Sequence, residues 1–233
     1  MGAIMKRRYK LILIIVLGAI LTFIINSLRV SSKTNFMAIG DGLSIGMTPY
    51  NVAGTSFNDY LAEKLENKKR LGIYNHEFSY SHETIHELNE HLKENTLGKT
   101  TRIPIKQTIA KTDILTIAIG IDEFVSLSLV DNISEEMITK YLKEIDLFLL
   151  SIREFYEKDI ILIGVYPTNT FSKKDAIEIN SKLKTICGKY NTSFIDVLAL
   201  SLNEKYYLQK DSYYMNYLAN QEIAKMIYVI IKK

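Results

Sequence analysis

Five short segments of the sequence carry residue types that could do chemistry. They are GDGLSIG (40–46), SYSHET (79–84), GIDEF (120–124), YPTNT (166–170) and KDSYYMNYLA (210–219). The first is a Gly-Asp-Gly turn after an apolar run. At such a turn a nucleophile can stand exposed at the end of a strand. Its central residue is Gly42, which has no side chain, so the turn carries the frame of an active site without an obvious nucleophile.

A second pattern is typical of a zinc site. HETIH, from His82 to His86, satisfies H-E-x-x-H, in which two histidines one helical turn apart bind zinc and Glu83 is the general base. No third ligand stands out, and the metzincin extension has Asn89 and Leu92 at its glycine and histidine positions. We therefore expect no metal and no cofactor, with His82 and His86 as weak zinc candidates. The competing interpretation is a partly exposed helix start with acidic residues near its positive end.

The first 33 residues differ in composition from the rest. Four basic residues precede an uncharged apolar span of about 20 residues, long enough to cross a bilayer as a helix. The positive-inside rule places the N-terminus in the cytoplasm. A cleaved signal peptide is the alternative, with only a weak small-residue site at 30–32. We predict a basic n-region (1–10), a transmembrane signal anchor (11–28), a tether (29–34) and an extracytoplasmic domain (35–233) at the cell membrane.

The charge of the chain is divided between these parts. All 26 acidic residues follow Lys33, whereas six of the 29 basic residues lie within residues 1–33. Residues 34–233 therefore carry 23 basic and 26 acidic residues, a net charge of −3. This balance argues against nucleic acid as a partner of the domain. The single cysteine, Cys187, excludes an intrachain disulfide and is expected to be a buried small hydrophobe.

Apolar runs and helix-period segments alternate along the domain. Strands are expected at 35–40, 72–81, 113–120, 159–167 and 192–197, and helices at 58–68, 83–94, 131–158, 173–190 and 217–233. Strands separated by single helices favour a parallel sheet with helices on both faces, a three-layer α/β/α sandwich. Ligands bind such sheets beyond the carboxyl ends of the strands, where the five segments fall.

These five segments, in this order, resemble the SGNH (GDSL) hydrolase family. AIGDGLSIG, TIAIGIDEF and DSYYMNYLANQEIA match its hydrophobic frame and spacing, and SYSHET matches by position. The resemblance covers roughly residue 35 to the C-terminus and implies an SGNH hydrolase-like, flavodoxin-like fold. It also implies a serine nucleophile, a histidine base oriented by an aspartate, and an oxyanion hole. That hole is made by the serine amide, a glycine amide and an asparagine side chain.

The positions to which the resemblance assigns chemistry are substituted. Gly42 stands at the serine position, His82 at the glycine, Asp122 at the asparagine and Tyr214 at the histidine, while Asp211 matches the aspartate. Glycine cannot attack a carbonyl, and tyrosine is a poor base at neutral pH. An ionised Asp122 would oppose the developing oxyanion. We therefore predict a pseudoenzyme at the cell envelope that binds or scaffolds, its partner an envelope protein or a glycan.

Two alternatives retain catalysis. One is a divergent SGNH esterase or acetyltransferase acting on acyl esters of lipid or cell-wall carbohydrate, with Ser44 as substitute nucleophile beside His82. The other is a zinc-dependent hydrolase that uses His82, Glu83 and His86. A turn hydroxyl is the preferred interpretation of Ser44. The expected ligand-binding pocket comprises Asp41, Gly42, Ser44, His82, Gly120, Asp122, Asp211 and Tyr214.

Overall fold

The computed structural model describes residues 16–18, 33–50, 52–130, 133–209 and 212–231. The chain divides into two compact units, Met1–Lys33 and Thr34–Lys233. Residues 16–18 are helical, and the remainder of the predicted 11–28 span, the 1–10 n-region and residues 29–32 of the tether lie outside the described residues. Within the residues described, no helix has the length and apolar character needed to cross a membrane.

The second unit is built on a five-stranded, wholly parallel sheet in the order β2-β1-β3-β4-β5. Its strands are β1 (Thr34–Gly40), β2 (Leu71–Ser79), β3 (Ile114–Ala118), β4 (Asp159–Ile163) and β5 (Ser193–Ile195). The central strands are continuous apolar runs because helices cover both of their faces. The register pairs Gly40 with Ala118, so the segments that follow β1 and β3 leave the sheet side by side.

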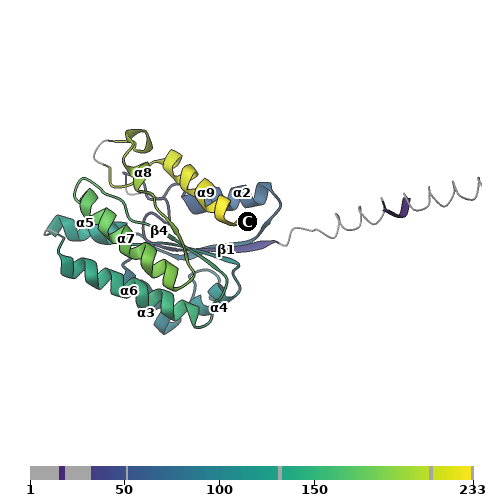
Figure 1. Cartoon of the computed structure of the whole chain (residues 1–233). Coiled ribbons are helices and arrows are strands. Elements are labelled where there is room, and N and C mark those ends of the chain that lie inside the picture. The colour runs from purple at the N-terminus through teal and green to yellow at the C-terminus, as the bar shows by residue number, and fades with distance from the viewer. Residues whose placement is uncertain (1–15, 19–32, 51, 131–132, 210–211, 232–233) are drawn as a thin grey trace, which may run out of the picture. The chain divides into compact units, whose positions relative to one another are not determined.

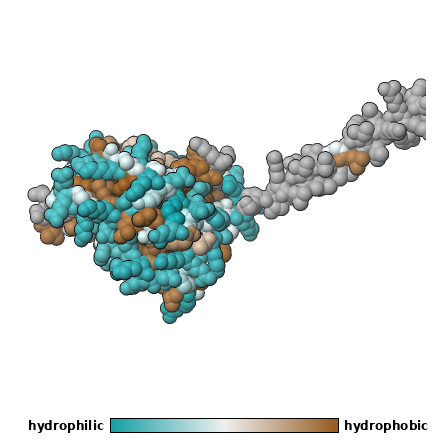
Figure 2. All heavy atoms as spheres, turned by 60° about the horizontal axis from the view of Figure 1, so that its bottom comes forward, coloured by the Kyte–Doolittle hydropathy of each residue, from teal (hydrophilic) through white to brown (hydrophobic). Residues whose placement is uncertain are grey.

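Helices cover both faces of the sheet, which confirms the three-layer prediction (Figure 1). On one face α2 (Phe57–Asn67) packs against α9 (Tyr217–Ile231). On the other lie α3 (Ile85–Glu94), α6 (Glu135–Arg153) and α7 (Lys173–Lys189). The shorter elements are α4 (Ile105–Ala110), α5 (Ile121–Val130), α8 (Leu198–Ser201) and the 3₁₀ turn η1 (Glu204–Tyr206). Figure 2 shows the α3–α6 side of the domain, where hydrophobic side chains are interspersed among hydrophilic ones.

Three predicted boundaries differ from the structure. The segment GIDEF, predicted as a strand-end loop, already contains the first turn of α5. The expected helix over 131–158 begins at Glu135 and ends at Arg153, since Ser134 caps its N-terminus by accepting a hydrogen bond from the Met137 amide. The helix expected from residue 83 begins at Ile85, after the cap residue Thr84. Each difference follows from a local cap or turn that hydrophobic periodicity does not report.

Among the described residues, the buried core lies in the second unit, between Phe36 and Ile227. Residues 34–233 therefore carry a hydrophobic core of their own, and we expect them to fold without residues 1–33. One polar strut crosses this core. The amide of fully buried Asn58 donates to the carbonyl and hydroxyl oxygens of Ser44 at 2.9 and 3.2 Å, and accepts from the Thr116 hydroxyl at 2.7 Å. The strut connects α2 and β3 to the segment that follows β1.

Asn58→Ala tests how strongly this strut supports the fold. The substitution leaves a buried hydroxyl and a buried carbonyl without their partner, so the free energy of unfolding should fall by about 2–4 kcal/mol. Urea denaturation of residues 34–233 measures this. Asn67→Ala, at the exposed last residue of α2, is the matched control and should change stability by less than about 0.5 kcal/mol. Equal effects of the two substitutions would show that the strut contributes nothing.

Candidate functional site

The Asp41 carboxylate connects the two segments that leave the sheet side by side. It is fully buried, and it accepts hydrogen bonds from the amides of Leu43 at 3.0 Å, Gly120 at 2.9 Å and Asp122 at 3.2 Å. Burial, and after it the charge of Asp122, raise the pKa of this carboxyl well above its ordinary value. Asp41 therefore fixes the loop after β1 to the first turn of α5, which positions the residues on either side.

A second buried carboxylate, that of Asp122, gathers donors from three different loops. Its Oδ2 accepts hydrogen bonds from the amides of Gly42 at 2.9 Å and His82 at 2.8 Å. Its Oδ1 accepts a hydrogen bond from the Tyr214 hydroxyl at 2.6 Å. The side chain is only 1% exposed. Four residues that are far apart in the sequence, all predicted for the site, are thus brought together around one carboxylate.

Gly42 lies where no side chain has room. A Cβ built on this residue would stand 2.8 Å from Oδ2 of Asp122 and 2.9 Å from the Tyr214 hydroxyl oxygen, closer than real Cβ atoms approach other atoms. A serine at position 42 would therefore have to displace Asp122 or Tyr214. The absence of a side chain at Gly42 and the position of the Asp122 carboxylate therefore belong to one closed arrangement.

Tyr214 closes the site from the segment that precedes α9. Only 6% of it is exposed, and its backbone is held by Ser212, whose hydroxyl donates to the Tyr214 carbonyl at 2.6 Å. Burial, followed by the hydrogen bond to Asp122 and the charge of Asp122, raise the pKa of Tyr214 above its ordinary value near 10. Tyr214 is therefore a neutral phenol that donates its proton. Asp211, predicted beside it, lies outside the described residues.

His82 contributes its backbone to the site and directs its ring outward. Its φ of 62° lies in the left-handed region that favours glycine, the residue that the resemblance places here. The side chain is 72% exposed, and its Nδ1 lies 3.9 Å from Oδ2 of Asp122. The amide, by contrast, donates directly to that oxygen. The backbone amide of His82 is therefore positioned to donate to an anion, in a conformation that favours glycine although the residue is histidine.

Among the described residues, the Ser44 hydroxyl is hydrogen-bonded to Ser79 and Asn58 and to no base. Ser44 is 2% exposed, and its hydroxyl is 2.9 Å from the Ser79 hydroxyl oxygen and 3.2 Å from the Asn58 amide nitrogen. Among the described residues no hydrogen bond joins Ser44 to His82. This geometry fits the turn-hydroxyl interpretation and lacks the base contact that a nucleophile needs.

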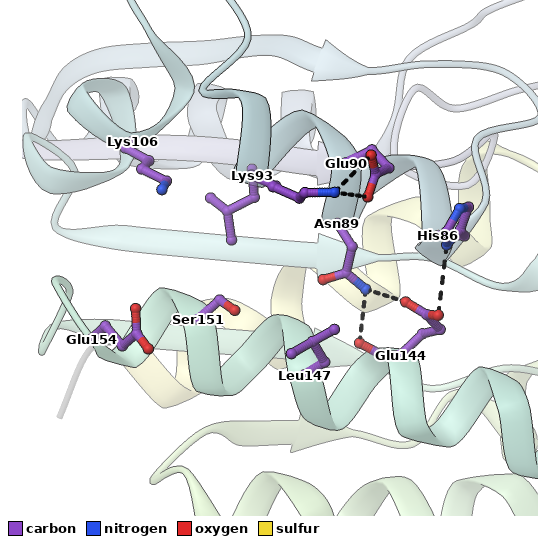
Figure 3. Close-up of a pocket in the computed structure, with 10 residues that line it drawn as sticks. His86, Asn89, Glu90, Lys93, Lys106, Glu144, Leu147, Ser151 and Glu154 are labelled. Carbon is purple, nitrogen blue, oxygen red and sulfur yellow. Dashed lines mark hydrogen bonds and ion pairs between the residues drawn. The ribbon is translucent and has the colours of Figure 1, made fainter.

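The H-E-x-x-H pattern does not form the helical pair that a zincin uses. Thr84 caps α3, so His82 precedes the helix and only His86 lies within it. His86 turns toward α6, where its Nδ1 is 3.6 Å from Oε1 of Glu144 in a groove that Figure 3 shows. The described residues contain no group of three or more histidines, cysteines or acidic residues able to hold a metal. His82 and His86 therefore do not share the helical face that the zinc alternative requires.

Glu83, the general base of that motif, is instead a buried acid. It is 6% exposed, and its Oε1 lies 3.2 Å from Nε2 of His91 without forming a hydrogen bond. Burial is the main reason that its pKa rises to about 7. The charge of Glu87 adds to the shift, and that of Lys99 opposes it. Glu83 therefore carries a proton at pH values where an ordinary glutamate has lost it.

The predicted ligand pocket is largely closed, because Asp41, Ser44, Asp122 and Tyr214 are between 0 and 6% exposed. A separate cavity of about 810 Å³ lies beyond the end of β4 and was not predicted. Its lining includes Thr168, Asn169, Ser172, Lys173, Glu204 and Tyr207. The cavity adjoins the closed site, since Ser212 borders it and also holds Tyr214. Two of the five segments, YPTNT and KDSYYMNYLA, contribute residues to its lining.

Comparison with known proteins identifies the fold. No protein-family model and no curated protein sequence match the chain. Solved structures do, at low sequence identity. A lipase/acylhydrolase from Enterococcus faecalis is 15% identical, with a TM-score of 0.63 over 85% of this chain and 95% of that one. The acetylxylan esterase Axe2 from Geobacillus stearothermophilus is 18% identical, with a TM-score of 0.66 over 88% and 97%.

A lipase, Lip_vut3, from a goat rumen metagenome is 19% identical and gives a TM-score of 0.67 over 84% of this chain and 97% of that one. The SGNH hydrolase-like fold that the sequence predicted is therefore confirmed for nearly the whole second unit.

Removal of the Asp122 carboxylate should leave a small anion site. Asp122→Gly removes the CH₂ and carboxylate groups and leaves two buried donors and the part-buried His82 amide without their acceptor, so the free energy of unfolding should fall by about 3 kcal/mol or more. Acetate can refill the space, and its carboxylate matches the donors. We therefore expect 0.1 M sodium acetate to raise the melting temperature of this variant above its value in sodium chloride of equal ionic strength.

Asp122→Asn is the matched control, because its side chain fills the same space and leaves no room for acetate. Neither it nor the unsubstituted protein should respond to acetate. An acetate response that is equal in all three proteins would contradict the anion-site geometry.

Glu83→Gln should flatten the pH dependence of stability. With a folded-state pKa of about 7 against 4.5 for an ordinary glutamate, the folded chain retains a proton that the unfolded chain loses. The contribution of Glu83 to the free energy of unfolding is therefore greatest below about pH 4.5 and is lost as the pH rises to 7. Glutamine mimics the protonated acid, so the variant should match the unsubstituted protein near pH 4.5 and exceed its stability by about 2 kcal/mol at pH 8.

Urea denaturation from pH 4.5 to 8 measures the difference. Glu94→Gln, at the exposed end of α3, controls for the loss of one negative charge. Parallel pH profiles for Glu83→Gln and the unsubstituted protein would show that Glu83 titrates normally.

Proposed function

We propose that this SGNH hydrolase-like domain is a catalytically inactive, membrane-anchored, extracytoplasmic protein with a binding or scaffolding role at the cell envelope. One observation carries the inactivity. The two backbone amides that correspond to the family oxyanion hole, those of Gly42 and His82, both donate to the carboxylate of Asp122. The oxygen that the hole would bind during catalysis is replaced by a side-chain oxygen of the protein itself, Oδ2 of Asp122.

The chemistry of acyl transfer explains why this replacement is incompatible with turnover. A substrate carbonyl needs the two amides free, and its oxygen becomes negative as the tetrahedral intermediate forms. A buried carboxylate in the same place repels that charge and blocks the donors. Loss of one oxyanion donor costs roughly 10²–10³ in kcat. Loss of the nucleophile or base costs on the order of 10⁶, and both positions are substituted here.

The solved structures with this fold include enzymes described as lipases and as an acetylxylan esterase. The fold by itself does not transfer their activities, since function resides in the site. What this chain retains is the scaffold and the cavity of about 810 Å³ beyond β4. Hydroxyl and amide side chains supply most of the polar lining of that cavity, which supports a neutral polar ligand such as a glycan. An envelope protein is the other partner class that we propose.

The membrane location is supported by the sequence of residues 11–28 and by the basic residues before them. A chain anchored in this way should remain with the membrane after alkaline carbonate extraction, and a protease added outside the cell should reach the domain. These two results separate an anchored chain from one released by signal cleavage.

Hydrolysis of p-nitrophenyl acetate tests the inactivity. Residues 34–233 should release nitrophenol no faster than a heat-treated sample of the same protein, and the Ser44→Ala variant should behave identically. A fluorophosphonate probe should label neither.

A saturable rate that disappears in Ser44→Ala would contradict the proposal and identify Ser44 as a displaced nucleophile. A saturable rate retained in that variant would contradict it as well, and would point to a different nucleophile or to an activated water.

A further inference from the structure

Basic side chains gather at the edge of the sheet where its strands begin, which lies opposite the closed site at the strand ends. Because all five strands are parallel, every helix-to-strand loop lies at the edge where the strands begin. Lys68, Lys69 and Arg70 form the loop between α2 and β2, and Lys111 lies between α4 and β3. The domain as a whole carries a net charge of −3, so this gathering is a local excess of positive charge.

Backbone contacts place both basic loops beside the start of β1. The Thr34 amide donates to the Arg70 carbonyl at 2.6 Å. The Asn35 side-chain amide donates to the Lys111 carbonyl at 3.0 Å. The two loops therefore flank the point at which the chain enters the domain.

A shallow groove of about 280 Å³ between α2 and α9 extends the same surface. Lys64, Lys68 and Lys225 line it, together with Glu63. Lys225 pairs with Glu222 at 2.7 Å, and Lys64 lies over the Tyr228 ring at 4.6 Å.

In the part of the chain that the structure describes, four of these basic residues have no carboxylate within ion-pair distance. They are Lys68, Lys69, Arg70 and Lys111. Their charge is therefore available to an external anion.

If the anchor of the proposed function is present, the length of the connecting chain limits how far this edge can lie from the bilayer. Lys33 directly precedes β1, and the predicted membrane span ends at residue 28. Residues 29–33, the five residues between the predicted span and β1, reach at most roughly 18 Å when fully extended. If the anchor of the proposed function is present, the start of β1 cannot lie farther than this from the membrane surface, and the loops beside it share that restriction.

We propose that this basic edge, made by Lys64, Lys68, Lys69, Arg70, Lys111 and Lys225, binds the anionic headgroups of the membrane in which the chain is anchored. Basic side chains near an anionic bilayer attract it by charge, additively and over about a Debye length. Binding orients the domain with the strand beginnings toward the lipid. The closed site and the cavity beyond β4, at the opposite edge, then face away from the membrane and toward a partner.

Flotation with lipid vesicles tests the proposal on residues 34–233, which carry the basic edge without the anchor. Vesicles that contain phosphatidylglycerol should bind the domain at 0.05 M NaCl and release it at 0.5 M, and vesicles of phosphatidylcholine alone should not bind it. The triple variant Lys68→Glu, Lys69→Glu, Arg70→Glu should lose about a hundredfold or more in partition coefficient, given roughly fivefold for each of the three basic residues.

The control variant makes an equal change in charge elsewhere. Lys173, Lys174 and Lys205 are exposed and lie at the start of α7 and in η1, so their replacement by glutamate should lower binding less than threefold. Equal losses in the two triple variants, or equal binding to both kinds of vesicle, would overturn the proposal.

The two proposals fail separately. If carbonate extracts the full chain from the membrane, the proposal of a membrane anchor is contradicted. Phosphatidylglycerol binding by residues 34–233 would still support the lipid-binding edge in that case. Absence of that binding would overturn the edge, whatever the result for the anchor.

Discussion

The carboxylate of Asp122 is the interaction on which the arrangement of this site depends. It accepts hydrogen bonds from the amides of Gly42 and His82 and from the hydroxyl of Tyr214, and it does so with almost no exposure to water. A buried carboxylate is stable only when its oxygens are hydrogen-bonded. The Asp122 carboxylate therefore holds in place the three loops that supply the donors, and it fills the space between them.

A second constraint is the proximity of two buried carboxylates. The Asp41 carboxylate accepts a hydrogen bond from the Asp122 amide. Burial, and after it the charge of Asp122, raise the pKa of Asp41. The site thus uses the aspartate of the Gly-Asp turn to hold the first turn of α5, and a second acid, Asp122, to hold the loops around it. Opening of the site would break the hydrogen bonds to Asp122 and lose the stabilisation that they supply.

The sequence was sufficient to predict the layered parallel fold, because long apolar runs alternate with helical periods and end in Gly-containing turns. It also brought together the positions of Gly42, His82, Asp122 and Tyr214, through a resemblance in spacing. It could not predict that Asp122 turns inward to accept those amides, since the hydrogen bonds join residues 40 to 92 positions apart. The H-E-x-x-H segment does not present both histidines from one helix for a local reason, because the Thr84 cap starts the helix after His82.

Native-state hydrogen exchange at the Gly42 and His82 amides most directly tests the proposal that Asp122 occupies the position of an oxyanion hole. Both amides belong to loops, and neither donates to another backbone group in the described structure. If Asp122 fills the hole, both should exchange at least ~10³-fold more slowly than in an unstructured chain, and both should lose that protection in Asp122→Ala. Exchange at the rate of exposed loop amides in the unsubstituted protein would mean that the hole is open to solvent, and would contradict the account.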